Sequence, residues 1–120
     1  MPFLAAASMD REAKKYRPLV YICSPFRGDE TGNADRARQY SRFAVDRGAI
    51  PLAPHLLFPQ FLKEGTEREL AMFMDLVLLG HCSELWVFGS TISEGMRMEI
   101  AKAEKKLIRI RYFTEEMEER

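Results

Sequence analysis

The sequence predicts a three-layer α/β domain built on a mainly parallel sheet of four to five strands. Short apolar runs alternate along the chain with segments of helical period, which is typical of βα units. Two of these runs, LVYICS (19–24) and ELWVFG (84–89), are apolar on both faces, as the central strands of a parallel sheet are. The length of 120 residues suits one domain with a core of its own.

The domain is predicted to span 19–113, with an N-terminal arm over 1–18 and a polar tail over 114–120. The 18 basic and 18 acidic residues cancel, so no overall field favours a nucleic-acid polymer or an anionic membrane. The apolar patch near the start is far shorter than a membrane span and nothing else indicates export, so we expect a cytoplasmic protein. The two cysteines lie far apart without metal-ligand spacing, which predicts reduced thiols and no metal.

The first predicted helix follows the strand at 19–24 after a loop that contains proline and glycine. Asn33 is its predicted N-cap and Gly48 its end. Its core face is expected to consist of Ala37, Tyr40, Ala44 and Val45. A short strand within AIPLAPHLL (49–57), ended by Pro54, comes next, and an aromatic loop follows it.

Two more helices and a strand complete the predicted order. Thr66 and Glu69 form a capping-box pattern at the start of one helix, and Gly80 ends it. The apolar side of that helix is expected to consist of Leu70, Phe73, Met74, Val77 and Leu78. Ser93 is the predicted N-cap of the other helix, which follows ELWVFG. The last run, LIRIRYF (107–113), alternates in polarity, which favours an edge or half-covered strand.

Candidate site residues are selected by a rule for open parallel sheets, in which ligands bind beyond the carboxyl ends of the strands. The loops there are expected to present Tyr21, Ser24, Phe26, Arg27, Gly28, His55 and Ser93. The loop GSTISEGM (89–96) lacks the glycine spacing of a dinucleotide fingerprint and the lysine of a Walker loop, which argues against those cofactors. Ser93 is either a plain helix cap or part of a seat for one anionic group on the helix amides.

Two acids each allow a functional and an ordinary interpretation. Glu99 lies beside the apolar stripe of its helix, and is either a surface partner of Lys102 or a catalytic group. Asp75 lies on the flank of the preceding helix's apolar face, and is either solvated or facing a cleft. Two half-buried acids about 5–9 Å apart across one cleft suit glycosyl transfer, in which one attacks the anomeric carbon and the other assists the leaving group.

Three stretches carry a resemblance to a known family: VYICSPFRG (20–28), ELWVF (84–88) and ISEGMRMEIAKA (92–103). Together with an aspartate in the helix before ELWVF, they resemble the nucleoside 2-deoxyribosyltransferase superfamily, including its small 2′-deoxynucleoside 5′-phosphate N-hydrolases. The resemblance covers about residues 19–112. It implies a Rossmann-like, flavodoxin-like sheet without a cofactor. It also implies cleavage or transfer at the N-glycosidic bond of a deoxyribonucleoside or its 5′-monophosphate, by a retaining mechanism.

The resemblance also implies roles for individual residues. The segment from Gly95 to Glu99 matches the motif that contains the glutamate nucleophile. Asp75 matches the aspartate that contacts the base or assists its departure, and Tyr21 matches a tyrosine near the nucleophile. Ser93 matches a serine that holds the 5′-phosphate in the hydrolases, whose Arg-Gly loop is similar to Arg27 and Gly28. The resembling enzymes complete their sites across subunits, so a homodimer or homotetramer is expected.

Several alternatives remain open. Glu94 stands beside Ser93 and would repel a phosphate, so an uncharged nucleoside is favoured over a nucleotide. Trp86 is either sheet core or, like Phe26 and Phe58, a surface on which a base stacks. His55 either bonds to backbone or contacts a substrate hydroxyl. A non-catalytic nucleoside- or nucleotide-binding or sensing module is the alternative function. A phosphoribohydrolase is disfavoured because no PGGxGT-like stretch occurs.

Overall fold

The computed structural model describes residues 15–120 and contains a four-stranded sheet in the order β2-β1-β3-β4. The two central strands are β1 (Leu19–Cys23) and β3 (Glu84–Phe88). The edges are β2 (Ile50–Leu52) and β4 (Arg109–Phe113). All three pairings are parallel. The predicted parallel sheet, its two central neighbours and the edge position of the last strand are therefore confirmed.

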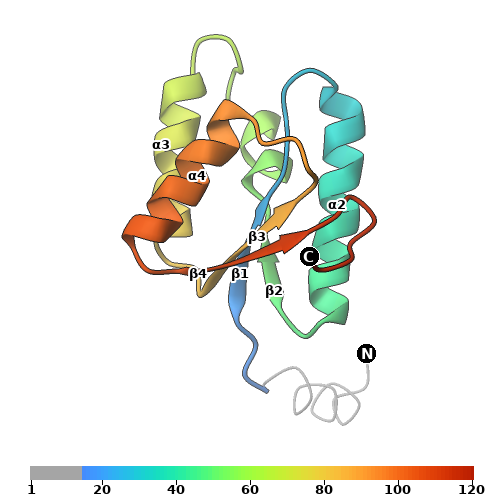
Figure 1. The fold of residues 1–120 in the computed structure, drawn as a ribbon. Coiled ribbons are helices and arrows are strands. Elements are labelled where there is room, and N and C mark those ends of the chain that lie inside the picture. The colour runs from blue at the N-terminus through green and yellow to red at the C-terminus, as the bar shows by residue number, and fades with distance from the viewer. Residues whose placement is uncertain (1–14) are drawn as a thin grey trace, which may run out of the picture.

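Helices cover both faces of the sheet, which gives the three predicted layers (Figure 1). One face is covered by α2 (Glu30–Asp46). The other is covered by α3 (Arg68–Leu79) and α4 (Glu94–Lys105), which lie side by side. Two short 3₁₀ turns, Pro54–Leu56 and Phe58–Gln60, connect β2 to α3. Within residues 15–120, no helix is both long and apolar enough to cross a membrane.

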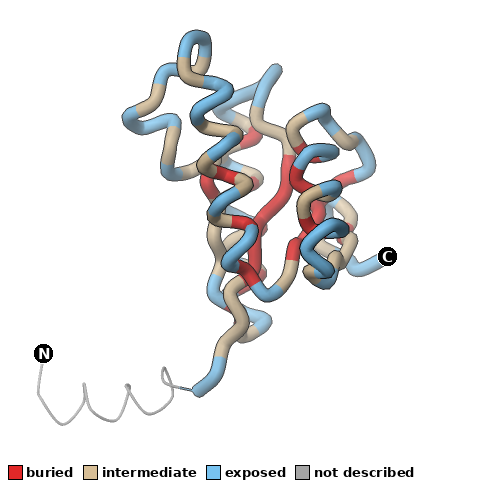
Figure 2. Tube along the Cα trace, turned by 90° about the vertical axis from the view of Figure 1, so that its left-hand side faces the viewer, coloured by how far each residue is buried: buried red, intermediate tan, exposed pale blue. Residues whose placement is uncertain are grey.

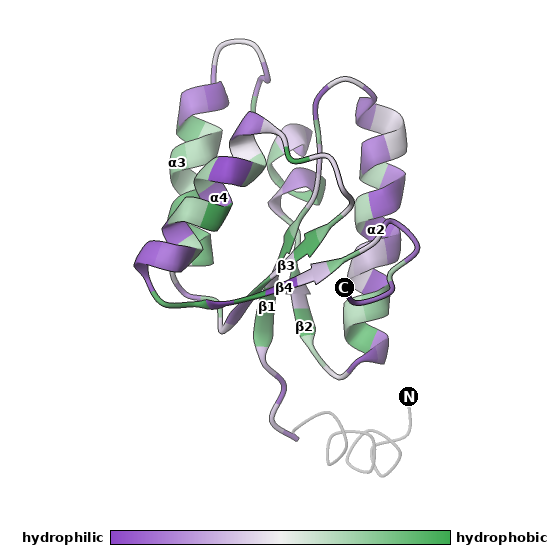
Figure 3. Ribbon diagram, in the orientation of Figure 1, coloured by the Kyte–Doolittle hydropathy of each residue, from purple (hydrophilic) through white to green (hydrophobic). Residues whose placement is uncertain are grey.

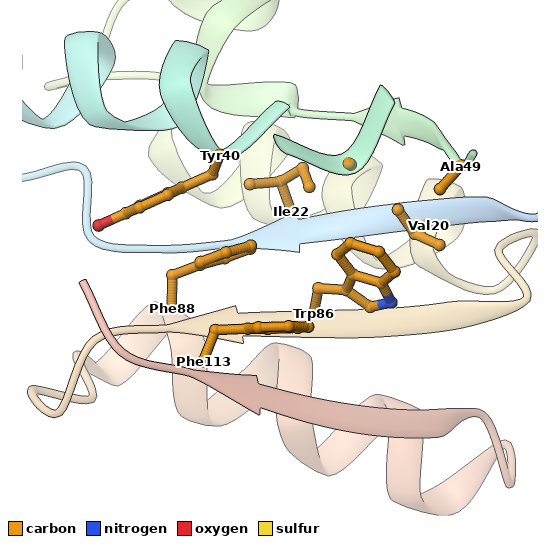
Figure 4. Packing of buried hydrophobic residues seen from close by; sticks show 8 residues of the cluster. Val20, Ile22, Tyr40, Ala49, Trp86, Phe88 and Phe113 are labelled. Carbon is orange, nitrogen blue, oxygen red and sulfur yellow. The ribbon is translucent and has the colours of Figure 1, made fainter. Parts of the chain in front are cut away.

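The strands divide the core into two clusters because successive side chains point to opposite faces. Val20, Ile22, Trp86 and Phe88 face α2, where Tyr40 stacks on Phe88 with ring centroids 4.1 Å apart. Figure 4 shows these side chains on one face of the strands. Trp86 is thus sheet core, the ordinary one of its two predicted roles.

The second cluster lies between the sheet and the pair α3 and α4. It contains Tyr21 and Cys23 from β1 and Leu85 and Val87 from β3, together with buried residues of both helices. The two central strands are the most deeply buried part of the described chain, and buried segments are red in Figure 2. Tyr21 and Cys23, whose hydroxyl and thiol can donate hydrogen bonds, thus point to the side of the sheet that α3 and α4 cover.

The first helix starts earlier than predicted. Asp29 is the N-cap of α2, and its side chain accepts a hydrogen bond from the Gly32 amide at 3.2 Å. The prediction of Asn33 as the N-cap was therefore wrong. Asn33 is a buried helical residue whose Nδ2 donates to the carbonyls of Phe26 and Arg27, at 2.9 and 3.3 Å. This amide fixes the loop after β1 to α2, which explains why a cap-forming residue lies inside the helix.

The prediction for α3 was wrong in two respects. Its N-cap is Glu67 without a side-chain capping bond, so Thr66 and Glu69 do not form the capping box. Its buried residues are Asp75 and Leu79. The predicted apolar side is instead exposed at Leu70, Phe73 and Val77. Figure 3 shows hydrophobic colour along most of α3, and this uniformity hides which face is inward. Gly80 ends the helix as predicted.

The residues after β4 fold back onto the sheet edge. Arg111 pairs with Glu119 at 2.7 Å, and Arg120 donates to the carbonyl of Gly89 at 3.0 Å. The predicted N-terminal arm lies outside the described residues except for its last four positions. The proposed boundaries of arm, domain and tail stay predictions.

Candidate active site

The strand order creates a site at the carboxyl ends of β1 and β3. The chain leaves β1 toward β2 on one side and later returns to β3 on the other, so the loops after β1 and β3 diverge there. A cavity of about 140 Å³ occupies this position. It is lined by the loop after β1, the 3₁₀ turns after β2, the inward face of α3 and the first turns of α4.

Most of the predicted site residues line this cavity. They are Phe26, Arg27, His55, Asp75, Ser93, Gly95 and Glu99. Ser24 and Gly28 do not line it, although both lie in the segment after β1. Tyr21 does not line it either, but its hydroxyl is bonded to Glu99. The structure therefore gathers residues from three strand ends, while their functional roles stay predictions.

Glu99 is held in the core by two donors from β1. Its side chain is only 1% exposed. The Tyr21 hydroxyl donates to Oε2, and the Cys23 thiol donates to Oε1 at 3.3 Å. Burial raises the pKa of Glu99 to about 7, and the two hydrogen bonds oppose that rise because they stabilise the charged form. The alternative of a surface pair with Lys102 was wrong.

Asp75 faces Glu99 from the neighbouring helix. It is 5% exposed, and its Oδ1 has no hydrogen-bond partner. Burial, and after it the charge of Glu99, raises the pKa of Asp75 to about 7. The alternative of a solvated carboxylate was therefore wrong. Because the two acids interact, they titrate as a pair, and the carboxyl with donors keeps the negative charge more readily than the one without.

The donors themselves hold their protons. Burial, and then the charge of Glu99, raises the pKa of Tyr21 well above its usual value. The same two causes raise the pKa of the Cys23 thiol. Both groups are thus neutral donors near neutral pH, and Glu99 is oriented without a positively charged partner.

His55 completes a compact group of three. One ligating atom each of His55, Asp75 and Glu99 lies within 4.8 Å of the other two. These carboxyl oxygens are thus closer together than the predicted 5–9 Å, because α3 and α4 pack directly together. Burial lowers the pKa of His55 to about 4, so its ring is neutral at neutral pH. The group could hold a metal ion or another positively charged species.

The wider pocket carries balanced charge. Apart from the buried pair Asp75 and Glu99, its lining includes three cationic and three anionic side chains, namely Arg27, Lys63, Arg68, Glu64, Glu67 and Glu94. Arg27 is already paired with Glu64 at 3.0 Å. This balance gives an anionic ligand no net attraction.

The start of α4 is shaped by two small residues. The Ser93 hydroxyl oxygen accepts a hydrogen bond from the Met96 amide at 3.2 Å, so the predicted N-cap is confirmed. A Cβ atom on Gly95 would lie 3.1 Å from the end of Met72, so the glycine leaves room for α3 beside the pocket.

Cys23 and Met72 are contacts of the site that the sequence interpretation missed. Met72 lies in the apolar helix whose inward face was assigned wrongly. Cys23 had a usable signal, because residues two apart on a strand point to the same face and Tyr21 was already a candidate.

The comparisons with known proteins agree with this fold. The model of a protein family described as a domain of unknown function, DUF7768, matches residues 18–113. The chain belongs to the DUF7768 family. Among curated proteins, none matches the chain.

A solved structure of similar fold is that of a 2-deoxyribosyltransferase from the psychrotolerant bacterium Bacillus psychrosaccharolyticus. It has a TM-score of 0.61 and 18% sequence identity, over 80% of this chain and 72% of the other. At this identity the likeness shows that the DUF7768 domain shares the fold of that enzyme.

Proposed function

We propose that the protein cleaves or transfers the N-glycosidic bond of a deoxyribonucleoside or its 5′-monophosphate, with Glu99 as nucleophile and Asp75 as the acid. The observation that carries the proposal is the pair of buried carboxyls in one cavity, with oxygens within 4.8 Å and donors on Glu99 alone. This spacing supports the retaining arrangement, in which the two carboxyls are about 5 Å apart. The fold shared with a 2-deoxyribosyltransferase is a second support.

One shared proton gives the two acids different roles. The pKa of each is raised to about 7, so a singly protonated pair is well populated near neutral pH. The charge rests on Glu99, which accepts two hydrogen bonds, and the proton on Asp75, whose Oδ1 has no partner. Glu99 is then ionised for attack while Asp75 can donate.

The reaction proceeds in two displacements. Glu99 attacks C1′, the bond to the base breaks, and Asp75 gives its proton to the departing base. A glycosyl ester on Glu99 results. Water or a second base then attacks C1′, its proton passes to Asp75, and Glu99 leaves as a carboxylate. The two buried acids, with no ion-pair partner among residues 15–120, favour the positive charge that develops on the sugar.

The pocket favours a neutral nucleoside over its monophosphate. Its lining charges balance outside the acid pair, the pair itself is negative, and Glu94 lies at the start of α4 where a phosphate would bind. Phe26 and Phe58 line the pocket and offer aromatic surfaces for the base.

The test is release of free base from a panel of deoxynucleosides and their 5′-monophosphates, with and without an acceptor base, followed by chromatography. Glu99→Gln should lower base release by about 10³-fold or more, because an amide cannot form the glycosyl ester. Glu104→Gln is the matched control, since Glu104 is an exposed acid on the same helix, and should retain full activity. Wild-type base release should follow a bell-shaped pH profile with its maximum near 7, between the two titrations of the pair.

Full activity in Glu99→Gln would contradict the mechanism. Wild-type protein that binds nucleosides and never releases base would instead support the binding or sensing module.

A further inference from the structure

Cys23 touches the proposed nucleophile directly, although it does not line the cavity. Tyr21 and Cys23 lie two residues apart on β1 and point to the same side of the sheet. The Tyr21 hydroxyl reaches one oxygen of Glu99 and the Cys23 thiol reaches the other. A carboxylate with one donor can still rotate about its last bond. With a donor on each oxygen, rotation breaks at least one bond, so the plane of the carboxylate is fixed.

We propose that Cys23 is a positioning residue, which holds the Glu99 carboxylate in the orientation for attack on the sugar. The proposal rests on the proposed function, in which Glu99 is the nucleophile. It assigns the orientation of that nucleophile to a thiol and a phenol acting together.

The thiol donates a hydrogen bond and does not itself attack. Cys23 is fully buried beneath Glu99, so a substrate in the cavity cannot reach its sulfur. Burial, and after it the negative charge of Glu99, raises the pKa of the Cys23 thiol, so the proton stays on the sulfur. No covalent step passes through Cys23.

A thiol suits this position because it is a weak donor. It fixes the direction of the Glu99 oxygen while withdrawing little of the electron density that Glu99 needs for attack. Its long bonds also let the sulfur contact the carboxylate at 3.3 Å from a strand that packs against α4.

The first test compares the two cysteines of the chain. Cys82 is a matched control, because it is also buried and donates to the Leu78 carbonyl, at 3.5 Å, away from the carboxyls. Cys23→Ala should lower kcat with little change in KM. The loss should be about 3–10-fold at about pH 6 and smaller at about pH 9, because the lost bond favoured the ionised form of Glu99. Cys23→Ser should recover part of the loss, and Cys82→Ala should keep the wild-type profile.

An equal loss in Cys82→Ala, or a loss that persists equally at both pH values and that Cys23→Ser does not recover, would show a structural role only and overturn the proposal.

The second test does not require turnover. The S–H stretch absorbs in an infrared window free of other protein bands, and Cys82→Ala leaves the Cys23 band alone. That band should shift as the pH crosses about 7, where Glu99 ionises, and the shift should disappear in Glu99→Gln. The Cys82 band, seen alone in Cys23→Ala, should not shift.

A Cys23 band that is constant across this pH range would overturn the proposal even if base is released. If the band shifts but the wild type releases no base, the hydrogen bond between Cys23 and Glu99 is supported. The catalytic role of Cys23 is then rejected together with the proposed function.

Discussion

At the scale of single residues, the central feature is a pair of buried acids without a cationic partner. Asp75 and Glu99 are 5% and 1% exposed, and neither forms an ion pair within residues 15–120. A group held in this way makes folding dependent on pH. Burial disfavours the charged form of both carboxyls, so protonation of the pair stabilises the folded protein.

Replacement of Asp75 by Asn should remove part of this dependence. The folded pKa of Asp75 is about 7, whereas that of an unfolded aspartate is about 3.9. Between these values the folded state keeps a proton that the unfolded state loses, so the contribution of Asp75 to wild-type stability falls as pH rises and is lowest above 7. Asp75→Asn should therefore exceed wild type in free energy of unfolding by about 1–3 kcal/mol above about pH 8, and by nothing below about pH 4.

Urea unfolding across this pH range would measure the difference. Burial lowers the pKa of His55, so this residue also makes the free energy of unfolding depend on pH. That contribution is present in both proteins and cancels from the difference between them. Glu104→Gln on the exposed surface of α4 is the control, and should follow wild type. A constant difference at all pH values would show that the effect of Asp75 is packing and not charge.

At the scale of elements, the end of α4 has a leucine where the backbone favours glycine. Leu107 has a φ of 59° and is 92% exposed. The Leu107 amide donates to Glu104 O and the Ile108 amide to Ala103 O, at 3.2 and 2.8 Å, which is a Schellman motif. The side chain at this position adds strain without contributing burial.

Leu107→Gly should therefore stabilise the protein. The expected gain in the free energy of unfolding is about 0.5–1 kcal/mol, because glycine adopts positive φ without the Cβ clash. Lys106→Gly is the control, since Lys106 has an ordinary φ of −87° and glycine there only adds unfolded-state entropy. Chemical denaturation would check both variants, and destabilisation by Leu107→Gly would contradict the argument.

The elements also show what a sequence can and cannot predict. The strands were predictable because a parallel sheet buries both faces, and Val20 to Cys23 are apolar throughout. The rotation of α3 was not, because its inward face carries Asp75 while Phe73 faces outward. Hydrophobic periodicity selects the wrong face when the inward side includes a buried acid and the outward side is apolar.

The candidate site also has parts that the sequence could predict and parts that it could not. Tyr21 could be selected from its place on a central strand, but residue type and helix position left both acids open, and only the family resemblance favoured the functional interpretation. The role of Asn33 could not, because both Asp29 and Asn33 are good caps, and only the path of the loop decides between them. Contacts such as that of Cys23 with Glu99 depend on how α4 lies over β1, which local sequence does not specify.

At the scale of the whole molecule, the outward face of α3 predicts self-association. Leu70, Phe73 and Val77 recur at helical spacing and are exposed, Phe73 by 65%. Such a stripe is costly in water unless covered. Since the other face of α3 lines the cavity, a second copy of the chain on this stripe would lie close to the pocket.

We expect sedimentation or light scattering to show a homodimer or homotetramer at micromolar concentration. Phe73→Glu should shift the protein toward monomer, because a charge would be buried in the interface. Leu107→Gly, which removes another exposed apolar side chain, should leave assembly unchanged. A monomeric wild type would exclude this mode of association.

The position of Trp86 decides how such experiments can be followed optically. It is the one tryptophan of the sequence, and it lies on the α2 side of the sheet, bonded to Glu84 and under the guanidinium of Arg111. The cavity is on the opposite side. Intrinsic fluorescence therefore reports whether the sheet and α2 are assembled, and it is insensitive to what occupies the pocket. Unfolding can thus be measured by emission in the presence of nucleosides, while their binding requires a readout from the other side of the sheet.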